Sequence, residues 1–316
     1  MDRNLALEFV RVTESAAIAA AAWMGKGDKI SADKAAVDEM RSRFNQIDFD
    51  GIVKIGEGEK DEAPMLYTGE KIGTGKGPAM DVALDPVEGT TNLSLGLPNS
   101  ISVVATGPRD HLLSMPGTYT EQLCVGPEAK EVIDIKASVK VNIHNIAKAL
   151  GKPVDEVTVV ILNRPRHEAM IKEIRDTGAR ISLIEHGTVA AGVAAAMPNS
   201  GVDVMMGTGG APEAVITAVG VKCFGGNMQA LLKPHKDKFL EDARKMGFHD
   251  LNKVLTMEDL AKGNNVTFAA TGITSGPLLK GVVFGRNTVT THSVVMRART
   301  RTIRYIEAIH NIGDMK

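Results

Sequence analysis

The order of apolar and polar positions along this 316-residue chain predicts helices that alternate with strands. Apolar side chains at helical spacing are expected in the segments 3–24, 31–45, 141–150, 166–177, 188–197, 212–219 and 236–247. Strand-like runs cover 51–55, 79–85, 101–106, 131–138, 156–162, 180–184, 202–206, 265–270 and 280–285. Such alternation is typical of an α/β protein rather than of runs of one element type.

An internal boundary is expected at Lys152-Pro153-Val154-Asp155, directly after a helix-like segment. The chain would then consist of an N-terminal α+β half, 1–152, and a C-terminal α/β half, 153–316, packed tightly together. Its length and its 43% of hydrophobic residues are sufficient for one large domain or two packed domains. The sequence shows no internal repeat and no low-complexity linker.

The segment from Asp85 to Asn92 places two carboxylates, Asp85 and Glu88, three residues apart in front of a glycine, two hydroxyls and an expected helix start. Pro86 is expected to stop the preceding strand, so both acids would lie at a strand's C-terminal edge, where open α/β sheets usually bind ligands. Carboxylates suit hard divalent cations, and helix N–H groups suit phosphate. A plainer interpretation is an ordinary Asp-Pro turn followed by an acid that the helix dipole favours.

Two further acidic segments follow strand-like runs. The first, from Gly56 to Glu62, carries carboxylates at Glu57, Glu59, Asp61 and Glu62. The second runs from Gly207 to Glu213, where Pro212 and Glu213 mark a helix start. Taken singly, these segments are interpreted equally well as functional acids or as a solvated acidic loop and a capped helix. Because all three acidic segments follow strands, they could converge at one sheet edge.

Taken in order, the motifs of this chain resemble those of the class II fructose-1,6-bisphosphatases, which belong to the lithium-sensitive, metal-dependent phosphatase superfamily. The resemblance covers most of the chain. Its motifs are Arg11-Val12-Thr13-Glu14-Ser15-Ala16-Ala17, Gly27-Asp28-Lys29, Ala32-Asp33, Ile55-Gly56-Glu57-Gly58-Glu59, Asp61-Glu62-Ala63-Pro64-Met65-Leu66, the segment 85–92, Pro165-Arg166-His167, Gly209-Gly210-Ala211-Pro212-Glu213 and Ala270-Thr271-Gly272-Ile273-Thr274. The segment 85–92 alone would indicate only the superfamily, which also contains inositol monophosphatases.

The resemblance implies a layered α-β-α-β-α sandwich of the sugar/inositol phosphatase type. It also implies a set of metal ligands, which are Asp33, Glu57, Asp85, Glu88 and Glu213. Five crowded carboxylates repel one another, so two or more Mn²⁺ or Mg²⁺ ions per site are the expected counter-charge. Such ions would activate water for in-line attack on phosphorus.

Thr90, Glu57 and Asp33 match the family's catalytic residues. The threonine either orients the attacking water together with a carboxylate or attacks directly, and the sequence leaves both open. The residues that match substrate contacts are Lys29, Glu88, Gly89, Thr90, Thr91, Tyr119, Arg164, Pro165, Arg166, Gly187 and Gly210. Without the resemblance, Lys29 is equally well a surface lysine, Tyr119 a half-buried aromatic, and the two arginines a solvated helix start.

The arginines at 164 and 166 are expected to bind the second phosphate of a bisphosphate, because the guanidinium fork pairs well with phosphate. One departure lies nearby: many family members have Asp-Gly-Asp where this chain has His186-Gly187-Thr188. Two acceptor carboxylates near the sugar hydroxyls are thereby replaced. This change bears on sugar recognition and leaves the phosphate chemistry as expected.

Charge and cysteine content narrow the class of partner. A net charge of −1 gives no general attraction to nucleic acid or anionic membrane. The basic run from Arg297 to Arg304 is interpreted as a solvated strand or helix face, or as an interface with another subunit.

Cys124 and Cys223 are expected to be buried free thiols, which suits the cytoplasm. No apolar stretch approaches the roughly eighteen residues of a membrane span. From the resemblance we expect a homodimer or homotetramer.

The expected function is metal-dependent hydrolysis of the 1-phosphate of fructose 1,6-bisphosphate, which gives fructose 6-phosphate and phosphate in gluconeogenesis. An alternative is a broader sugar bisphosphatase that also acts on sedoheptulose 1,7-bisphosphate, which the altered segment 186–188 suggests. A remote alternative is a non-catalytic sugar-phosphate-binding protein, against which the intact Thr90 and acid set argue.

Overall fold

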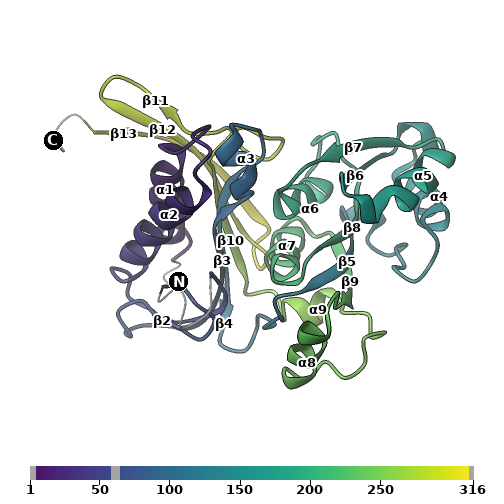
Figure 1. Ribbon diagram of the computed structural model, residues 1–316, viewed down its shortest axis with the longest axis horizontal. Coiled ribbons are helices and arrows are strands. Elements are labelled where there is room, and N and C mark those ends of the chain that lie inside the picture. Colours follow the sequence, from purple (N-terminus) through teal and green to yellow (C-terminus); the bar gives the residue numbers. More distant parts are fainter. Residues whose placement is uncertain (1–4, 58–64, 313–316) are drawn as a thin grey trace. The chain divides into compact units, whose positions relative to one another are not determined.

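The computed structural model describes residues 5–57 and 65–312, and the chain divides into two compact units (Figure 1). The first unit combines Met1–Leu112 with Asn265–Lys316, and the second is Leu113–Asn264. The boundary expected near Lys152 therefore lies inside the second unit. The chain leaves the first sheet, builds the second unit, and then returns to add its last strands to the first sheet.

The first unit contains an eight-stranded sheet within the described residues. Its order is β11-β12-β10-β4-β3-β1-β2, with β13 paired to β12. The strands are β1 (Asp50–Ile55), β2 (Lys71–Ile72), β3 (Ala79–Glu88), β4 (Ile101–Pro108), β10 (Thr267–Gly272), β11 (Val283–Phe284), β12 (Thr288–Arg297) and β13 (Thr302–Asn311). Only β1 and β3 pair in parallel among these strands.

Two long helices, α1 (Ala6–Ala21) and α2 (Lys29–Phe44), pack side by side against the first sheet (Figure 1). Three rings join them to the loop before β1: Phe9 lies 6.3 Å from Phe44 and 5.7 Å from Phe49, centroid to centroid. All three side chains are almost fully buried, so the hydrophobic effect fixes both helices on the sheet. Helix α2 begins where the Asp28 carboxylate accepts a hydrogen bond from the Ser31 N–H at 3.0 Å. A short helix, α3 (Thr90–Leu95), follows β3.

The second unit contains a five-stranded sheet in the order β7-β6-β8-β5-β9. Its strands are β5 (Tyr119–Val125), β6 (Thr158–Leu162), β7 (Arg180–Ile184), β8 (Val204–Gly210) and β9 (Asn227–Lys233). Helices α4 (Val139–Leu150) and α5 (Glu168–Asp176) share an apolar cluster with one face. Helices α6 (Thr188–Ala196) and α7 (Ala211–Phe224) cover the other face (Figure 1). Shorter elements are η1 (Pro127–Ala129), η2 (Val154–Glu156), η3 (Pro165–His167), α8 (Asp237–Lys245) and α9 (Met257–Leu260).

The predicted α/β class, with helices layered on sheets, is confirmed. Cys124 in β5 and Cys223 in α7 are buried free thiols, as expected, and burial raises the pKa of the Cys124 thiol. Within the described helices, none has the length and apolar character needed to cross a membrane.

The strand predicted over 131–138 is wrong, because this segment is a loop without a strand partner. Its apolar residues Ile133 and Ile135 are buried, which produced the strand-like pattern. Side chains replace the missing ladder: Asn142 bonds the backbone N–H and C=O of Asp134 at 2.9 and 2.7 Å, and Gln229 accepts from the Ile135 N–H at 2.8 Å. Buried backbone groups must find partners, and here amides supply them.

The prediction that Pro86 stops the strand is also wrong, because β3 continues to Glu88. The β3–β4 register shifts between Asp85 and Glu88, and such an irregularity accommodates a proline that cannot donate to the ladder. Strands β2, β5, β9, β12 and β13 were not predicted. The basic run from Arg297 to Arg304 is the end of β12, a turn and the start of β13.

A buried polar cluster joins α1 to the last strands of the first sheet. Glu14 on α1 accepts hydrogen bonds from Thr291 at 3.3 Å and from Ser293 at 3.5 Å. The Thr291 hydroxyl also lies 2.9 Å from Nε2 of His310 on β13. Burial raises the pKa of the Glu14 carboxyl above its ordinary value of 4.5, and the nearby His310 partly opposes this rise.

We expect Glu14→Gln to stabilise the protein relative to the wild type as the pH rises. A carboxyl whose pKa is raised by folding contributes stability below its unfolded pKa, and this contribution is lost as the pH rises through the folded pKa. Each pKa unit by which folding raises the pKa of Glu14 corresponds to about 1.4 kcal/mol of free energy of unfolding. Urea unfolding from pH 4 to pH 8 measures the difference, with the exposed Glu39→Gln as control. If the free energies of unfolding of the wild type and Glu14→Gln differ by the same amount at every pH, this account is contradicted.

Candidate functional site

The junction of β3 and α3 brings together the residues predicted around position 88. Glu88 ends the strand and is 4% exposed, Gly89 adopts φ 85°, and Thr90 begins the helix. The Asp85 carboxylate accepts from the Val87 N–H at 3.0 Å, and the Thr90 hydroxyl donates to the Val87 carbonyl at 3.0 Å. Both side chains are thereby held on the same tight turn, as the sequence predicted.

Glu57 lies two residues beyond the end of β1, and Asp85 lies at the matching position within β3. The two strands are parallel, and their register pairs Ile55 with Ala83, so Glu57 and Asp85 each lie two residues beyond a paired position. Carboxyl ends of parallel neighbours meet at one sheet edge. The acids Glu59, Asp61 and Glu62 of the same segment lie outside the described residues.

The first turns of α2 contribute Lys29 and Asp33, which share one face of the helix at i, i+4 spacing. The Lys29 Nζ donates to the Thr91 hydroxyl at 2.8 Å, which ties the start of α2 to the start of α3. Asp33 is half-buried, and desolvation raises the pKa of its carboxyl. Lys29 is exposed, and its bond to Thr91 joins two residues that the sequence assigned to the substrate site.

In the second unit, Glu213 lies in the first turn of α7, directly after β8. Its Oε2 atom is buried and has no hydrogen-bond partner among the residues that the structure describes, and burial raises the pKa of the carboxyl. The carboxylate folds back so closely over Gly210 that a side chain at position 210 would collide with it. A Cβ at position 210 would therefore displace the Glu213 carboxylate from the position it has here.

The predicted Tyr119 and Arg166 also lie together. The Arg166 guanidinium carbon is 4.8 Å from the centre of the Tyr119 ring, a cation–π geometry. Arg166 also donates to the Thr208 carbonyl at 2.9 Å. Pro165 belongs to the same turn, η3, and is exposed. Strand β8 therefore holds the arginine-bearing turn in place.

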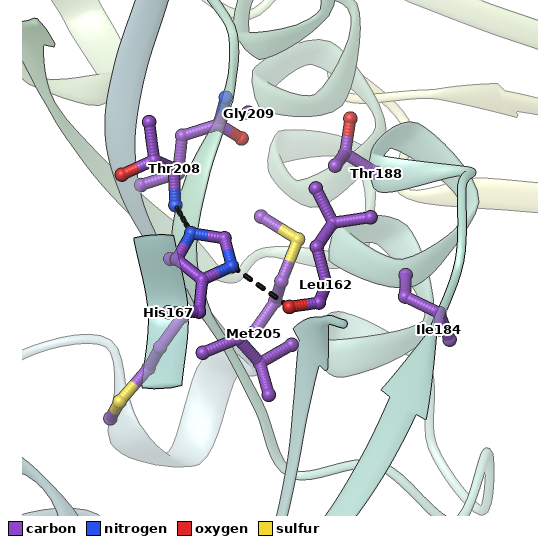
Figure 2. A pocket seen from close by; sticks show the side chains of 11 residues that line it. Leu162, His167, Ile184, Thr188, Met205, Thr208 and Gly209 are labelled. Atoms are coloured by element: carbon purple, nitrogen blue, oxygen red, sulfur yellow. Dashed lines mark hydrogen bonds between the residues drawn. The ribbon is translucent and has the colours of Figure 1, made fainter. Parts of the chain in front are cut away.

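His167 supplies the second connection between η3 and β8 (Figure 2). Its Nε2 accepts from the Thr208 N–H at 2.8 Å, and its Nδ1 donates to the Leu162 carbonyl at 2.8 Å. Because an N–H can only donate, the imidazole carries its proton on Nδ1, and burial lowers the pKa of His167. Pairing of β6 with β8 ends at Met205, so His167 and Arg166 satisfy backbone groups that a strand would otherwise bond.

Arg164 has a different environment from Arg166. It forms an ion pair with Glu185 at 3.1 Å, and its Nη2 lies 3.2 Å from Nε2 of His186. Asn163 donates to the other Glu185 oxygen at 2.8 Å, and together with Arg164 it lowers the pKa of that carboxyl. Gly187 follows at φ 98° as the N-cap of α6, so the expected turn is retained despite the change at His186.

Sequence reasoning missed His235. Its ring stacks on Tyr119, with centroids 4.4 Å apart and planes at 23°. The antiparallel pairing of β5 with β9 puts Lys233 opposite Tyr119, so His235 lies just beyond the end of β9. Prediction of β5 and β9 as neighbours would have found this residue, but neither strand was predicted.

The donor chemistry of the acidic residues fits a hard divalent cation, since each of them offers carboxylate oxygen. Burial raises the pKa of Asp33 in the first unit and of Glu213 in the second, and a cation beside either carboxylate would supply the counter-charge that solvent does not. Between residues 5–57 and 65–312, three or more carboxylate, imidazole or thiol groups do not gather closely enough to hold a metal. The complete ligand set therefore stays a prediction.

Comparison with known proteins gives a consistent result. The chain is 47% identical to fructose-1,6-bisphosphatase 1 class 2 of Escherichia coli (strain K12) over 322 residues, which covers 98% of this chain and 96% of that protein. The same figures hold for the class 2 enzyme of Shigella flexneri. A solved structure of an extragenic suppressor from Pyrococcus furiosus aligns with a TM-score of 0.31 and 14% identity, over 60% of this chain and 68% of that one.

The family model described as bacterial fructose-1,6-bisphosphatase, glpX-encoded, matches residues 3–310. The motifs that suggested the class II enzymes thus lie inside one continuous match. This chain belongs to the glpX-encoded family of bacterial fructose-1,6-bisphosphatases.

Proposed function

We propose that this protein hydrolyses the 1-phosphate of fructose 1,6-bisphosphate, giving fructose 6-phosphate and phosphate, as a step of gluconeogenesis. The observation that carries the proposal is the 47% identity to a fructose-1,6-bisphosphatase across 98% of the chain. The tight turn of Asp85, Glu88 and Thr90 supports it, since this turn holds a hydroxyl beside two carboxylates at a helix start.

The family is metal-dependent. We assign Mn²⁺ or Mg²⁺ as the metal, with two or more ions per site. The assigned ligands are Asp33, Glu57, Asp85, Glu88 and Glu213. When bound, such ions supply positive charge that activates water and stabilises developing charge on the attacking and leaving oxygens.

We assign to Thr90 the orientation of the attacking water. Its hydroxyl hydrogen is used in the bond to the Val87 carbonyl, so its oxygen remains an acceptor for a proton of water. Glu57 and Asp33 are the carboxylates assigned to share that water. The backbone N–H groups after Gly89 would hold the phosphoryl oxygens, and the ammonium of Lys29, bonded to Thr91, would add positive charge.

The second phosphate is assigned to Tyr119, Arg164 and Arg166 in the second unit. Arg166 is held by the Thr208 carbonyl and by the Tyr119 ring, so its remaining donors are already oriented for a dianion. Gly187, the N-cap of α6, and Gly210 are assigned as substrate contacts, and Pro165 would keep η3 rigid. Binding energy at this second phosphate would align the reacting one.

We further propose a cytoplasmic homodimer or homotetramer that acts on a small molecule and binds neither nucleic acid nor membrane. The net charge of −1 and the two buried free cysteines support this assignment. Exposed Phe284, Tyr305 and Ile309 on β11 and β13 support an interface between copies.

A broader sugar bisphosphatase is the second candidate, and the segment 186–188 favours it. His186 lies beside Arg164, and Thr188 begins α6, where many family members carry two acids. Loss of these acceptors would weaken discrimination between sugars of different length.

We expect Thr90→Ala to lower kcat for phosphate release by about 10²–10⁴-fold, the usual worth of a group that manages proton transfer to or from water. Thr90→Ser keeps the hydroxyl and should retain most of the rate. Release of phosphate from fructose 1,6-bisphosphate measures both variants, and circular dichroism confirms that they fold. Full activity in Thr90→Ala would contradict the assigned role, and tight binding by the wild type without turnover would indicate a non-catalytic binding protein.

Removal of metal with a chelator should abolish phosphate release, and Mn²⁺ or Mg²⁺ should restore it. We expect Glu213→Gln to weaken Mn²⁺ binding at least about tenfold, or roughly 1.4 kcal/mol, because an ion loses one charged ligand. Calorimetry of the metal-free protein measures this affinity directly. Glu168→Gln, which changes an exposed first-turn glutamate of α5, is the matched control. Equal Mn²⁺ affinity in both variants would remove Glu213 from the ligand set.

Sugar specificity is measured by kcat/KM for fructose 1,6-bisphosphate and sedoheptulose 1,7-bisphosphate. If the protein is a fructose-1,6-bisphosphatase, we expect a clearly higher kcat/KM for the fructose ester. Comparable kcat/KM values for the two sugars would favour the broader sugar bisphosphatase. If the missing acids cause a weak preference, the double variant His186→Asp, Thr188→Asp should increase it. A double variant with unchanged selectivity would show that this segment does not set the sugar preference.

A further inference from the structure

A stack of three rings, which we call the aromatic stack, runs from Tyr119 through His235 to Phe239. The Tyr119 and His235 rings are 4.4 Å apart at 23°, and the His235 and Phe239 rings are 4.7 Å apart at 35°. These separations are those of offset-stacked pairs. The stack therefore connects the first residue of β5 to helix α8 through side chains alone.

His235 is held from more than one side, although it is exposed. The Thr118 hydroxyl lies 3.4 Å from its Nδ1, and the backbone of Tyr119 is fixed by the β5–β9 ladder opposite Lys233. A ring held between Tyr119 and Phe239 restricts the rotation of Tyr119. Restricting a side chain before ligand binding lowers the entropy cost of ordering it later.

Both ends of the aromatic stack carry cations. The Arg166 guanidinium lies 4.8 Å from the Tyr119 ring, and the Lys236 ammonium lies 5.9 Å from the Phe239 ring. Lys233 is paired with Glu121 at 3.1 Å, so its charge is locally balanced. An anion drawn to Arg166 would thus meet a Tyr119 ring whose orientation depends on His235.

We propose that His235 is a positioning residue for the phosphate that is not hydrolysed. It does not bind the phosphate; it fixes Tyr119, and through Tyr119 the guanidinium of Arg166. The inference rests on the proposed function, because it takes Tyr119 and Arg166 as the groups that hold this phosphate. No motif around position 235 suggested the role, and only the stacking geometry does.

Three variants test the proposal. His235→Ala removes the stack, His235→Phe keeps a ring of similar size, and His144→Ala removes an exposed histidine from α4 as the matched control. We expect His235→Ala to raise KM for fructose 1,6-bisphosphate by about 2- to 12-fold, the range that corresponds to one aromatic contact, with a smaller change in kcat. His235→Phe should restore KM to near the wild-type value.

A second substrate separates positioning from general damage. An aryl phosphate has only one phosphate, so His235→Ala should lower its kcat/KM far less than that of the bisphosphate. Equal losses on both substrates would indicate a merely structural role and overturn the proposal. A KM for His235→Ala no higher than that for His144→Ala would overturn it too, as would a failure of His235→Phe to rescue.

Binding of fructose 6-phosphate, measured by calorimetry, tests the role of His235 separately from the proposed hydrolysis. This ligand carries the phosphate assigned to Tyr119 and Arg166 and requires no turnover. Weaker binding by His235→Ala than by His235→Phe supports the positioning role even if the wild type fails to hydrolyse the bisphosphate. Equal binding by the two variants refutes the positioning role even if the wild type is fully active.

Discussion

The left-handed backbone at Gly89 is the constraint on which the acidic part of the site depends. At φ 85° the chain leaves a strand that ends in the buried Glu88 and enters a helix that begins at Thr90, without an intervening loop. A side chain at position 89 would lie 3.2 Å from the Asn99 carbonyl and the Ser100 hydroxyl, and φ is unfavourable for any residue with a Cβ. The positions of Asp85 and Thr90 follow from this turn, since both bond to Val87.

In the second unit, the corresponding constraint is the part of the β8 edge that β6 does not pair with. Strand β6 stops pairing with β8 at Met205, and the backbone of Thr208 is then bonded by His167 and Arg166. The same contacts that satisfy this backbone also place Arg166 beside Tyr119. The contacts that satisfy this backbone therefore also hold the arginine that we propose for the second phosphate.

Several predictions succeeded because they depended on local geometry. A glycine before a Thr-Thr pair indicated a helix start, Pro212 and Glu213 indicated another, and the structure has α3 and α7 at these positions. Predictions failed where distant side chains replaced local signals. Buried Ile133 and Ile135 gave the loop at 131–138 a strand-like pattern, but its backbone bonds to the side chains of Asn142 and Gln229 instead of a strand. Strand β3 passes through Pro86, where its register with β4 shifts.

The sequence by itself determined the α/β class, the family and the chemical types of the candidate residues, because hydrophobic periodicity, turn residues and ordered motifs are properties of neighbours along the chain. Only the tertiary structure decided which of those residues touch. Lys29 bonds Thr91, Arg164 is paired with Glu185, and His235 stacks on Tyr119. The physical reason is that such contacts depend on strand order and register, which long-range packing sets and which no single segment of sequence encodes.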